Sequence, residues 1–298
     1  LLLGVVSFLI NYHYGFVGMM PMDNTVLFNG GYRVLKGYTP FSDYWLVTGP
    51  LLDYLNAFFF KILGVSWNAF IIHSSTFNSI LAITSYYFFK KMGLTNLFSF
   101  IYSLLISILF YPIVGTPFVD HHSTFFIILA FYGLILSIKT NNSNYYFFIP
   151  TILCLSFLSK QTPAAYAIIL ISILILIISF FYKQKRVEIL KKFIFGSIIA
   201  LSFLFLFFFI TKINLDDFIQ QYIFFASSIG EERITNYKFN IFNEIFKYKF
   251  ISYFIFLLLF TLIKLKLKNS LNIDASFILV ICVIFALLLI FHQMISLN

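Results

Sequence analysis

The 298-residue sequence is 61% hydrophobic and only 10% charged, with a mean hydropathy of +0.95. Water-soluble domains are about 45–50% apolar and about 25% charged, so this composition excludes an ordinary soluble protein. The net charge of +9 does not indicate nucleic-acid binding, because the positive residues stand in short clusters between apolar runs. Such clusters are typical of the topology signals of membrane proteins.

The apolar stretches predict an all-α, polytopic membrane protein with about eight or nine spans. In chain order we expect spans at 1–12, 66–89, 97–112, 123–138, 145–158, 163–182, 193–211, 250–263 and 275–295. A span needs about 20 apolar residues, so 1–12 is only part of one, and we expect a fragment that begins inside its first span. The lysine and proline of the segment SKQTP, 159–163, predict a break between two short helices.

The charges of the loops predict the orientation of the chain. One alternate set of loops holds eleven Lys or Arg residues and only two acids, Glu188 and Asp274. The other set holds nine positive residues and nine acids. The positive-inside rule places the first set in the cytoplasm and the second set outside. Any chemistry is then expected in the outer loops, 13–65, 113–122 and 212–249, of a single membrane domain that covers residues 1–298.

Two segments of the outer loops have the pattern of amphipathic helices. Residues 51–63 mix apolar side chains with Asp53, Asn56 and Lys61, and residues 213–229 mix acids and glutamines with Ile and Phe. We expect both segments to lie as helices in the plane of the membrane interface.

The segment 21–54 carries most of the groups that could do chemistry. It combines Asp23, Asp43, Arg33 and Lys36 with several turn-forming Gly and Pro residues. The alternative interpretation is a solvated loop with Tyr and Trp at the headgroup level. Further along, Lys160 lies between two apolar spans, where a charge costs about 2.5–3.5 kcal/mol on insertion scales. It is either functional or a lysine that snorkels from a helix end.

A second cluster is formed by Asp120, His121 and His122. Carboxylate and imidazole suit several divalent metals, but adjacent residues of a helix point about 100° apart, which disfavours one shared ion. We expect contact with a substrate more than metal binding, and the bland alternative is a helix cap at Asp120. No cofactor is required by any motif. The polar run from His73 to Asn78 is expected to pack between membrane helices.

Three segments together resemble the GT-C superfamily of membrane glycosyltransferases, and in particular bacterial protein-mannosyltransferase and aminoarabinose-transferase types. The first is Asp23 directly after span one, the second is RVLKGYTPFSDYW followed by GPLLDY, and the third is LSKQTPAAY around Lys160. The similarity covers most of residues 10–185 and becomes weak beyond 193.

This resemblance implies transfer of a sugar, with inversion expected, from a polyprenyl-phosphate carrier to a glycan, lipid or protein acceptor. The site would face the periplasm or exterior of a bacterial inner membrane. Asp23 is the first candidate for the general base that deprotonates the acceptor, and Asp43 is the second. Arg33, Lys36 and Lys160 are candidates to stabilise the departing phosphate, and Asp120, His121 and His122 to contact substrate. The alternatives are a flippase or another transporter of lipid-linked sugars, a polymerase or ligase of cell-surface glycans, and a non-catalytic membrane scaffold.

Overall fold

A computed structural model describes residues 1–17, 21–236, 246–267 and 273–296, and in this part of the chain all the regular elements are helical. The long helices are α1 (Leu2–Tyr14), α4 (Trp67–Met92), α5 (Asn96–Leu109), α6 (Val119–Lys139), α7 (Asn144–Ser159), α8 (Gln161–Phe181), α9 (Arg186–Thr211), α13 (Lys249–Leu267) and α14 (Ile273–Ser296). The others are α2 (Pro21–Leu35), α3 (Leu51–Leu63), η1 (Tyr111–Ile113), η2 (Lys183–Lys185), α10 (Leu215–Phe218), η3 (Ile219–Phe224) and α11 (Phe225–Asn236). The expected all-α class is therefore confirmed.

Among the described residues, four segments are long and apolar enough to cross a membrane: Asn96–Ile113, Val119–Lys139, Gln161–Phe181 and Lys183–Thr211. A fifth would be α3 together with α4, but these helices meet at 118°. The prediction of eight or nine spans is thus not confirmed. For α1 and α7 the physical reason is length, because they have 13 and 16 residues against the roughly 20 that a bilayer requires.

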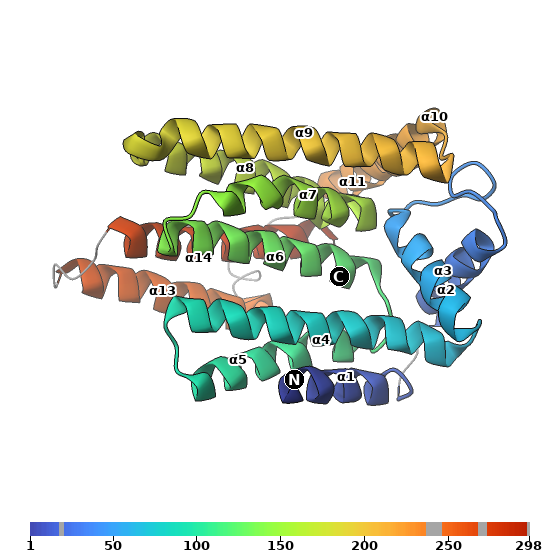
Figure 1. Ribbon diagram of the computed structural model, residues 1–298, viewed down its shortest axis with the longest axis horizontal. Coiled ribbons are helices and arrows are strands. Elements are labelled where there is room, and N and C mark those ends of the chain that lie inside the picture. Colours follow the sequence, from blue (N-terminus) through green and yellow to red (C-terminus); the bar gives the residue numbers. More distant parts are fainter. Residues whose placement is uncertain (18–20, 237–245, 268–272, 297–298) are drawn as a thin grey trace.

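The long helices lie side by side along the long axis of the molecule (Figure 1). At one end α2 and α3 lie across the ends of the long helices, next to α10. We call this the loop end. The opposite end holds the short connections after α4, α6 and α8, and we call it the basic end.

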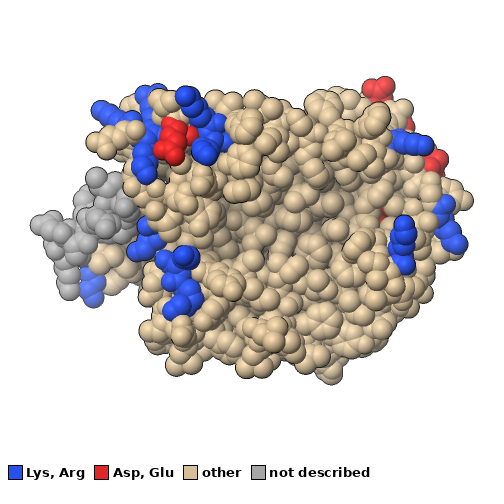
Figure 2. All heavy atoms as spheres, viewed as in Figure 1, with Lys and Arg blue, Asp and Glu red and all other residues tan. Residues whose placement is uncertain are grey.

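Charge separates the two ends (Figure 2). Lys and Arg side chains crowd the basic end around a single acidic patch, whereas the loop end shows acids and bases together. At the basic end, Ser143 donates a hydrogen bond to Glu188, and Lys185 Nζ donates to the Asn141 carbonyl at 2.9 Å. The loops that alternate in charge along the sequence thus lie at opposite ends of the folded bundle, and the two ends differ in charge.

Local sequence signals explain where the central helices begin and end. Ser66 caps α4, since its hydroxyl accepts from the Ala69 amide at 3.1 Å. Gly93, with a φ of +99°, ends α4 in the left-handed conformation that glycine tolerates. Lys160 has extended backbone between α7 and α8, so the predicted break at 159–163 is present.

The polar run of α4 packs against α1 through buried hydrogen bonds. Asn11 on α1 donates to the hydroxyls of Ser74 and Ser75 at 3.0 Å each. About one turn away, the Asn78 amide donates to the Ser7 hydroxyl at 3.0 Å. All five side chains are fully buried. Most of this run therefore joins two helices, as small polar residues do in membranes.

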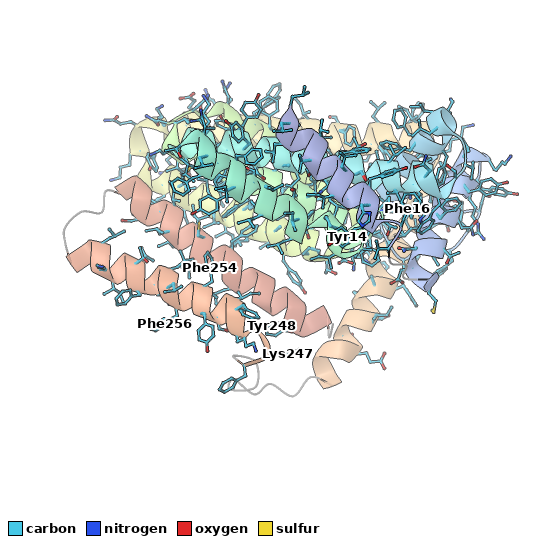
Figure 3. The ribbon with its side chains drawn as sticks, turned by 90° about the horizontal axis from the view of Figure 1, so that it is seen from below. Tyr14, Phe16, Lys247, Tyr248, Phe254 and Phe256 are labelled. Carbon is cyan, nitrogen blue, oxygen red and sulfur yellow. The ribbon has the colours of Figure 1, made fainter. Side chains whose placement is uncertain are left out.

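The outer surfaces of several helices are apolar. On α9, Phe205 and Phe209 are 68% and 82% exposed. Figure 3 shows α13 and α14 as a hairpin at the side of the bundle, with Phe254 and Phe256 on α13, which are also exposed. Large exposed aromatic surface on such apolar helices is suited to contact with lipid tails.

Candidate functional site at the loop end

The segment 38–50 holds the loop end together. It has little regular structure, and two chain regions far apart in sequence, η3 and the α7–α8 turn, bind its backbone. Gln221 of η3 accepts from the Leu46 amide at 3.1 Å and donates to the Phe41 carbonyl at 2.7 Å. Ser42 donates to the Asp217 carboxylate of α10 at 3.1 Å. Because Gln221 is only 7% exposed, its two hydrogen bonds are shielded from competing water.

The same segment is bound to the turn between α7 and α8. The Gly49 amide donates to the Ser159 carbonyl at 3.1 Å, and the Gln161 side chain donates to the Val47 carbonyl at 3.0 Å. A Cβ on residue 49 would lie 2.0 Å from the Leu158 carbonyl oxygen, so only glycine permits this approach. Segment 38–50 is therefore placed directly beside Lys160.

Lys160 forms an ion pair with Asp120, the second residue of α6. Its Nζ lies 2.6 and 2.7 Å from the two carboxylate oxygens. The Lys160 side chain is 26% exposed and that of Asp120 is 30% exposed, so water and solutes still reach the pair. Asp120 does not cap α6, contrary to the bland interpretation, because Phe118 holds the cap position without a side-chain bond. The predicted loop 113–122 thus ends at 118.

The two candidate bases are both exposed, and their surroundings differ. Asp43 Oδ2 accepts from the Thr39 amide at 2.6 Å, and the Asp43 amide donates to the Thr39 carbonyl at 2.9 Å. Asp43 thereby closes a turn inside segment 38–50. Asp23, in the first turn of α2, makes no hydrogen bond or ion pair with any residue that the structure describes. Its carboxylate is left available to solvent.

Arg33 and Lys36 lie exposed near the end of α2, each close to an aromatic ring. The Arg33 guanidinium stands over the Tyr44 ring at 5.1 Å, and the Lys36 ammonium stands over the Tyr32 ring at 5.5 Å. Neither is paired with Asp23 or Asp43 by any contact in the described chain. Both cations therefore remain able to meet an anion from outside.

An acid that the sequence analysis did not select, Asp53, lies beneath this surface. It is 1% exposed, and Tyr44 donates to its Oδ2 at 2.7 Å. Burial raises the pKa of Asp53 to about 7, although the Tyr44 hydrogen bond and Arg33 act in the opposite direction. Burial and the nearby Asp53 charge raise the pKa of the Tyr44 phenol as well, so Tyr44 stays a donor. A strongly shifted acid beside a cation is a feature of functional sites.

A close helix contact accounts for this burial. A Cβ on Gly30 would lie 2.3 Å from Asp53 Oδ1, and one on Gly31 would lie 2.3 Å from the Asn56 Cβ. The glycine pair therefore lets α2 lie directly on α3 over two polar residues spaced by three positions. That spacing was the available sequence signal, but an amphipathic pattern alone does not show which side a polar face packs against.

The two histidines of the predicted cluster turn away from Asp120. The His121 ring packs among Phe110, Tyr111 and Phe118 at centroid distances of 5.4, 5.6 and 5.9 Å. His122 is fully buried, with its Nε2 3.1 Å from the Nε2 of His73. The expected contact of His122 with substrate is thus not possible in this conformation.

The three residues of the cluster also do not converge on one point. This is the expected result of their 100° spacing on a helix. No group of three or more His, Cys, Asp or Glu side chains in the described part of the chain could hold a metal ion.

Two pockets lie away from these residues. One of 460 Å³ lies between the start of α1, the end of α4 and the start of α5, where Leu3, Ile83, Tyr86 and Asn96 line it. A small one at the basic end is lined by Ser143 and Lys185, among others. Neither is lined by a predicted site residue, so the case for a site rests on the exposed charges of the loop end and their contacts.

No family model, curated protein or solved structure matches the sequence. The geometry of the loop end is therefore what a proposal about function must be argued from.

Proposed function

We propose that the protein is a glycosyltransferase of the bacterial inner membrane, with eight or nine spans, that uses a polyprenyl-phosphate sugar at its loop end. The observation that carries the proposal is the assembly of segment 38–50. Contacts from α3, the α7–α8 turn and η3 hold this irregular segment, and acids and cations surround it. An irregular segment held by three partners is a rigid platform for reacting groups, as preorganised catalysis requires.

The chemistry follows from the charges that are exposed there. A carboxylate takes the proton of an acceptor hydroxyl, whose oxygen attacks the anomeric carbon of the sugar, and the bond to the lipid phosphate breaks. Asp23 is free for the first task, since it has no partner among the described residues. The departing phosphate takes the electron pair of the broken bond, and Arg33, Lys36 and Lys160 are the cations at hand to stabilise it. Lys160 must then either leave Asp120 or bind Asp120 and the phosphate at the same time.

The proposal is tested with the full-length protein in lipid, by transfer or hydrolysis of a panel of polyprenyl-phosphate sugars. We expect Asp23→Asn to lower turnover by about 10²–10⁴-fold, the usual contribution of a general base. Asp43→Asn keeps an oxygen that can accept from Thr39, so a comparable loss in that variant would assign the base to Asp43 instead. Asp216→Asn, at an exposed acid of α10 on the same end, is the matched control and should keep full turnover.

One observation favours a transporter of lipid-linked sugars as the second candidate. His73 and His122 are ionisable groups buried between α4 and α6, and such residues inside a helix bundle often mark a transport path. The full-length protein in lipid also serves to decide between the transferase and the transporter. If Asp23→Asn and Asp43→Asn together retain full turnover, or if no donor is turned over while labelled lipid-linked sugar crosses the bilayer, the transferase proposal is wrong.

A further inference from the structure

Two histidines from different helices form a buried chain of hydrogen-bonding groups that the proposed transfer reaction does not use. His73 of α4 and His122 of α6 meet at 3.1 Å through their Nε2 atoms. The Nδ1 of His73 lies 2.6 Å from Asn56 Oδ1 of α3, and the Nδ1 of His122 lies 3.2 Å from the Phe118 carbonyl oxygen. Asn56, His73 and His122 are all fully buried.

The direction of the chain is determined at both of its ends. The Asn56 amide nitrogen donates to the Leu27 carbonyl at 3.1 Å, so its oxygen must be the atom that faces His73. If the amide were reversed, the Asn56 side-chain oxygen would face the Leu27 carbonyl oxygen, and both atoms are acceptors. His73 Nδ1 therefore has to carry a hydrogen. At the other end, a carbonyl oxygen can only accept, so His122 Nδ1 has to carry a hydrogen as well.

A count of hydrogens shows that the neutral pair cannot satisfy this chain. The three contacts, at Asn56, between the rings and at Phe118, need one hydrogen each. A neutral imidazole carries one N–H hydrogen, so two neutral rings supply two hydrogens for three contacts. In one contact the two atoms then meet lone pair to lone pair, with no hydrogen between them. One additional proton supplies the third hydrogen. A buried polar group without its partner is costly, which makes the incomplete chain a specific binding site for that proton.

Aromatic rings lie around both imidazoles. Phe59 is stacked on the His73 ring, with centroids 4.7 Å apart and an interplanar angle of 17°. Phe77 lies 4.6 Å from the His122 ring, and Tyr111 lies 5.4 Å from it. The faces of aromatic rings attract cations within about 6 Å, and most strongly when water is excluded.

The described elements packed around the pair also carry titratable groups farther along their length, such as Tyr54 and Lys61 on α3, Tyr86, Tyr87, Lys90 and Lys91 on α4, and Tyr132 and Lys139 on α6. Those nearer to the histidines are few. On η1 there is Tyr111, and on α6 there are His121 and Asp120, the latter paired with Lys160. On α3 there is Asp53, one turn before Asn56 and bound to Tyr44. No described carboxylate touches either histidine, so the rings and not an ion pair must hold the proton.

We propose that His73 and His122 together bind one proton, shared between their Nε2 atoms, as a site distinct from the charged surface of the loop end. The bound proton completes a chain from Leu27 of α2 through α3 and α4 to Phe118 at the start of α6. Loss of the proton breaks one link of that chain. The site thereby couples the protonation state to the contact among the helices that carry the loop end.

The test is NMR of the full-length protein in lipid bilayers, with ¹⁵N in the histidine rings, between about pH 8 and about pH 4, the range in which imidazole ordinarily titrates. We expect one bare ring nitrogen to disappear from the pair as the pH falls, which leaves three N–H groups and one bare nitrogen. A coupling between the two Nε2 atoms should accompany it. His73→Gln identifies which signals belong to the pair.

Two results on the wild-type protein would overturn the proposal, and neither depends on a variant that folds. One is that each ring keeps a bare nitrogen over the whole range. The other is that two protons enter and all four nitrogens become N–H. In His122→Gln we expect His73 to keep its bare nitrogen at every pH, whereas His13→Gln, at an exposed histidine of α1, should leave the pair unchanged. Titration of His73 that persists unchanged in His122→Gln would also exclude a shared proton.

Discussion

The contrast between Asp23 and Asp53 shows how little residue type alone says about a carboxylate. Both are acids in the first turn of a short helix at the loop end. Asp23 is open to solvent, whereas Asp53 lies under α2 and is closed off by Tyr44. The first is suited to exchange protons with a substrate. The second accepts a hydrogen bond from Tyr44 and thereby fixes this residue of segment 38–50 to α3.

The raised pKa of Asp53 predicts a pH dependence of stability. An unfolded Asp has a pKa of about 3.9, so the folded state binds this proton more tightly. The stabilisation from protonated Asp53 is then complete below about pH 4 and is lost as the pH rises to about 7. Three pKa units correspond to about 4 kcal/mol, an upper value because buried groups relax on ionising.

Asp53→Asn should remove this loss, because the amide oxygen still accepts from Tyr44 and never ionises. We expect the variant to be about 2–4 kcal/mol more stable than the wild type at about pH 8, with little difference at about pH 4. Thermal unfolding in detergent across this range measures it, with Asp216→Asn as the exposed control. Identical pH slopes in the wild type and Asp53→Asn would show that Asp53 is not a buried carboxyl with a raised pKa.

At the level of elements, the contact of segment 38–50 with the α7–α8 turn depends on Gly49. Its Cα faces backbone atoms, and a Cβ would come within 2.0 Å of the Leu158 carbonyl oxygen and 2.7 Å of the Ser159 carbonyl carbon. Backbone cannot rotate away as a side chain can. Any larger residue must therefore move the segment off the turn that carries Lys160.

We accordingly expect Gly49→Ala to destabilise the protein by about 1–3 kcal/mol, the usual cost of overpacking. Gly230→Ala is the matched control, since nothing lies within 4 Å of its added Cβ in α11 and alanine favours helix there. Unfolding temperatures in detergent give the comparison. If Gly49→Ala unfolds at the wild-type temperature, the close approach of segment 38–50 to the turn is not present in solution.

The helices themselves were largely predictable from the sequence, and their partners were not. The expected span 66–89 is α4, Trp67–Met92, and the amphipathic segment 51–63 is α3 within the same bounds. Periodicity and caps are local, so they show where a helix runs. They do not reveal which helices meet, and so His73 was assigned to packing and His122 to substrate, although the two face each other.

At the scale of the whole molecule, the segregation of charge is the property that unites sequence and fold. Loops that alternate along the chain gather at opposite ends of one bundle (Figures 1 and 2). The excess of Lys and Arg at the basic end predicts that this end stays in the cytoplasm, because positive residues near span ends resist translocation. The loop end, with acids and bases together, should then face outward, where the proposed reaction would take place.

Cysteine labelling in intact cells tests this orientation. In a background of Cys154→Ala and Cys282→Ala, single cysteines replace exposed residues at the loop end, Tyr38 and Lys61, or at the basic end, Lys90 and Lys183. We expect a membrane-impermeant maleimide to label Tyr38→Cys and Lys61→Cys in intact cells, and to label Lys90→Cys and Lys183→Cys only after the cells are broken. The reverse pattern would place the loop end in the cytoplasm and remove the access to an outer substrate on which the transfer reaction depends. Mixed labelling within one end would instead contradict the two-ended bundle, because residues that share an end of a membrane-crossing structure must share a compartment.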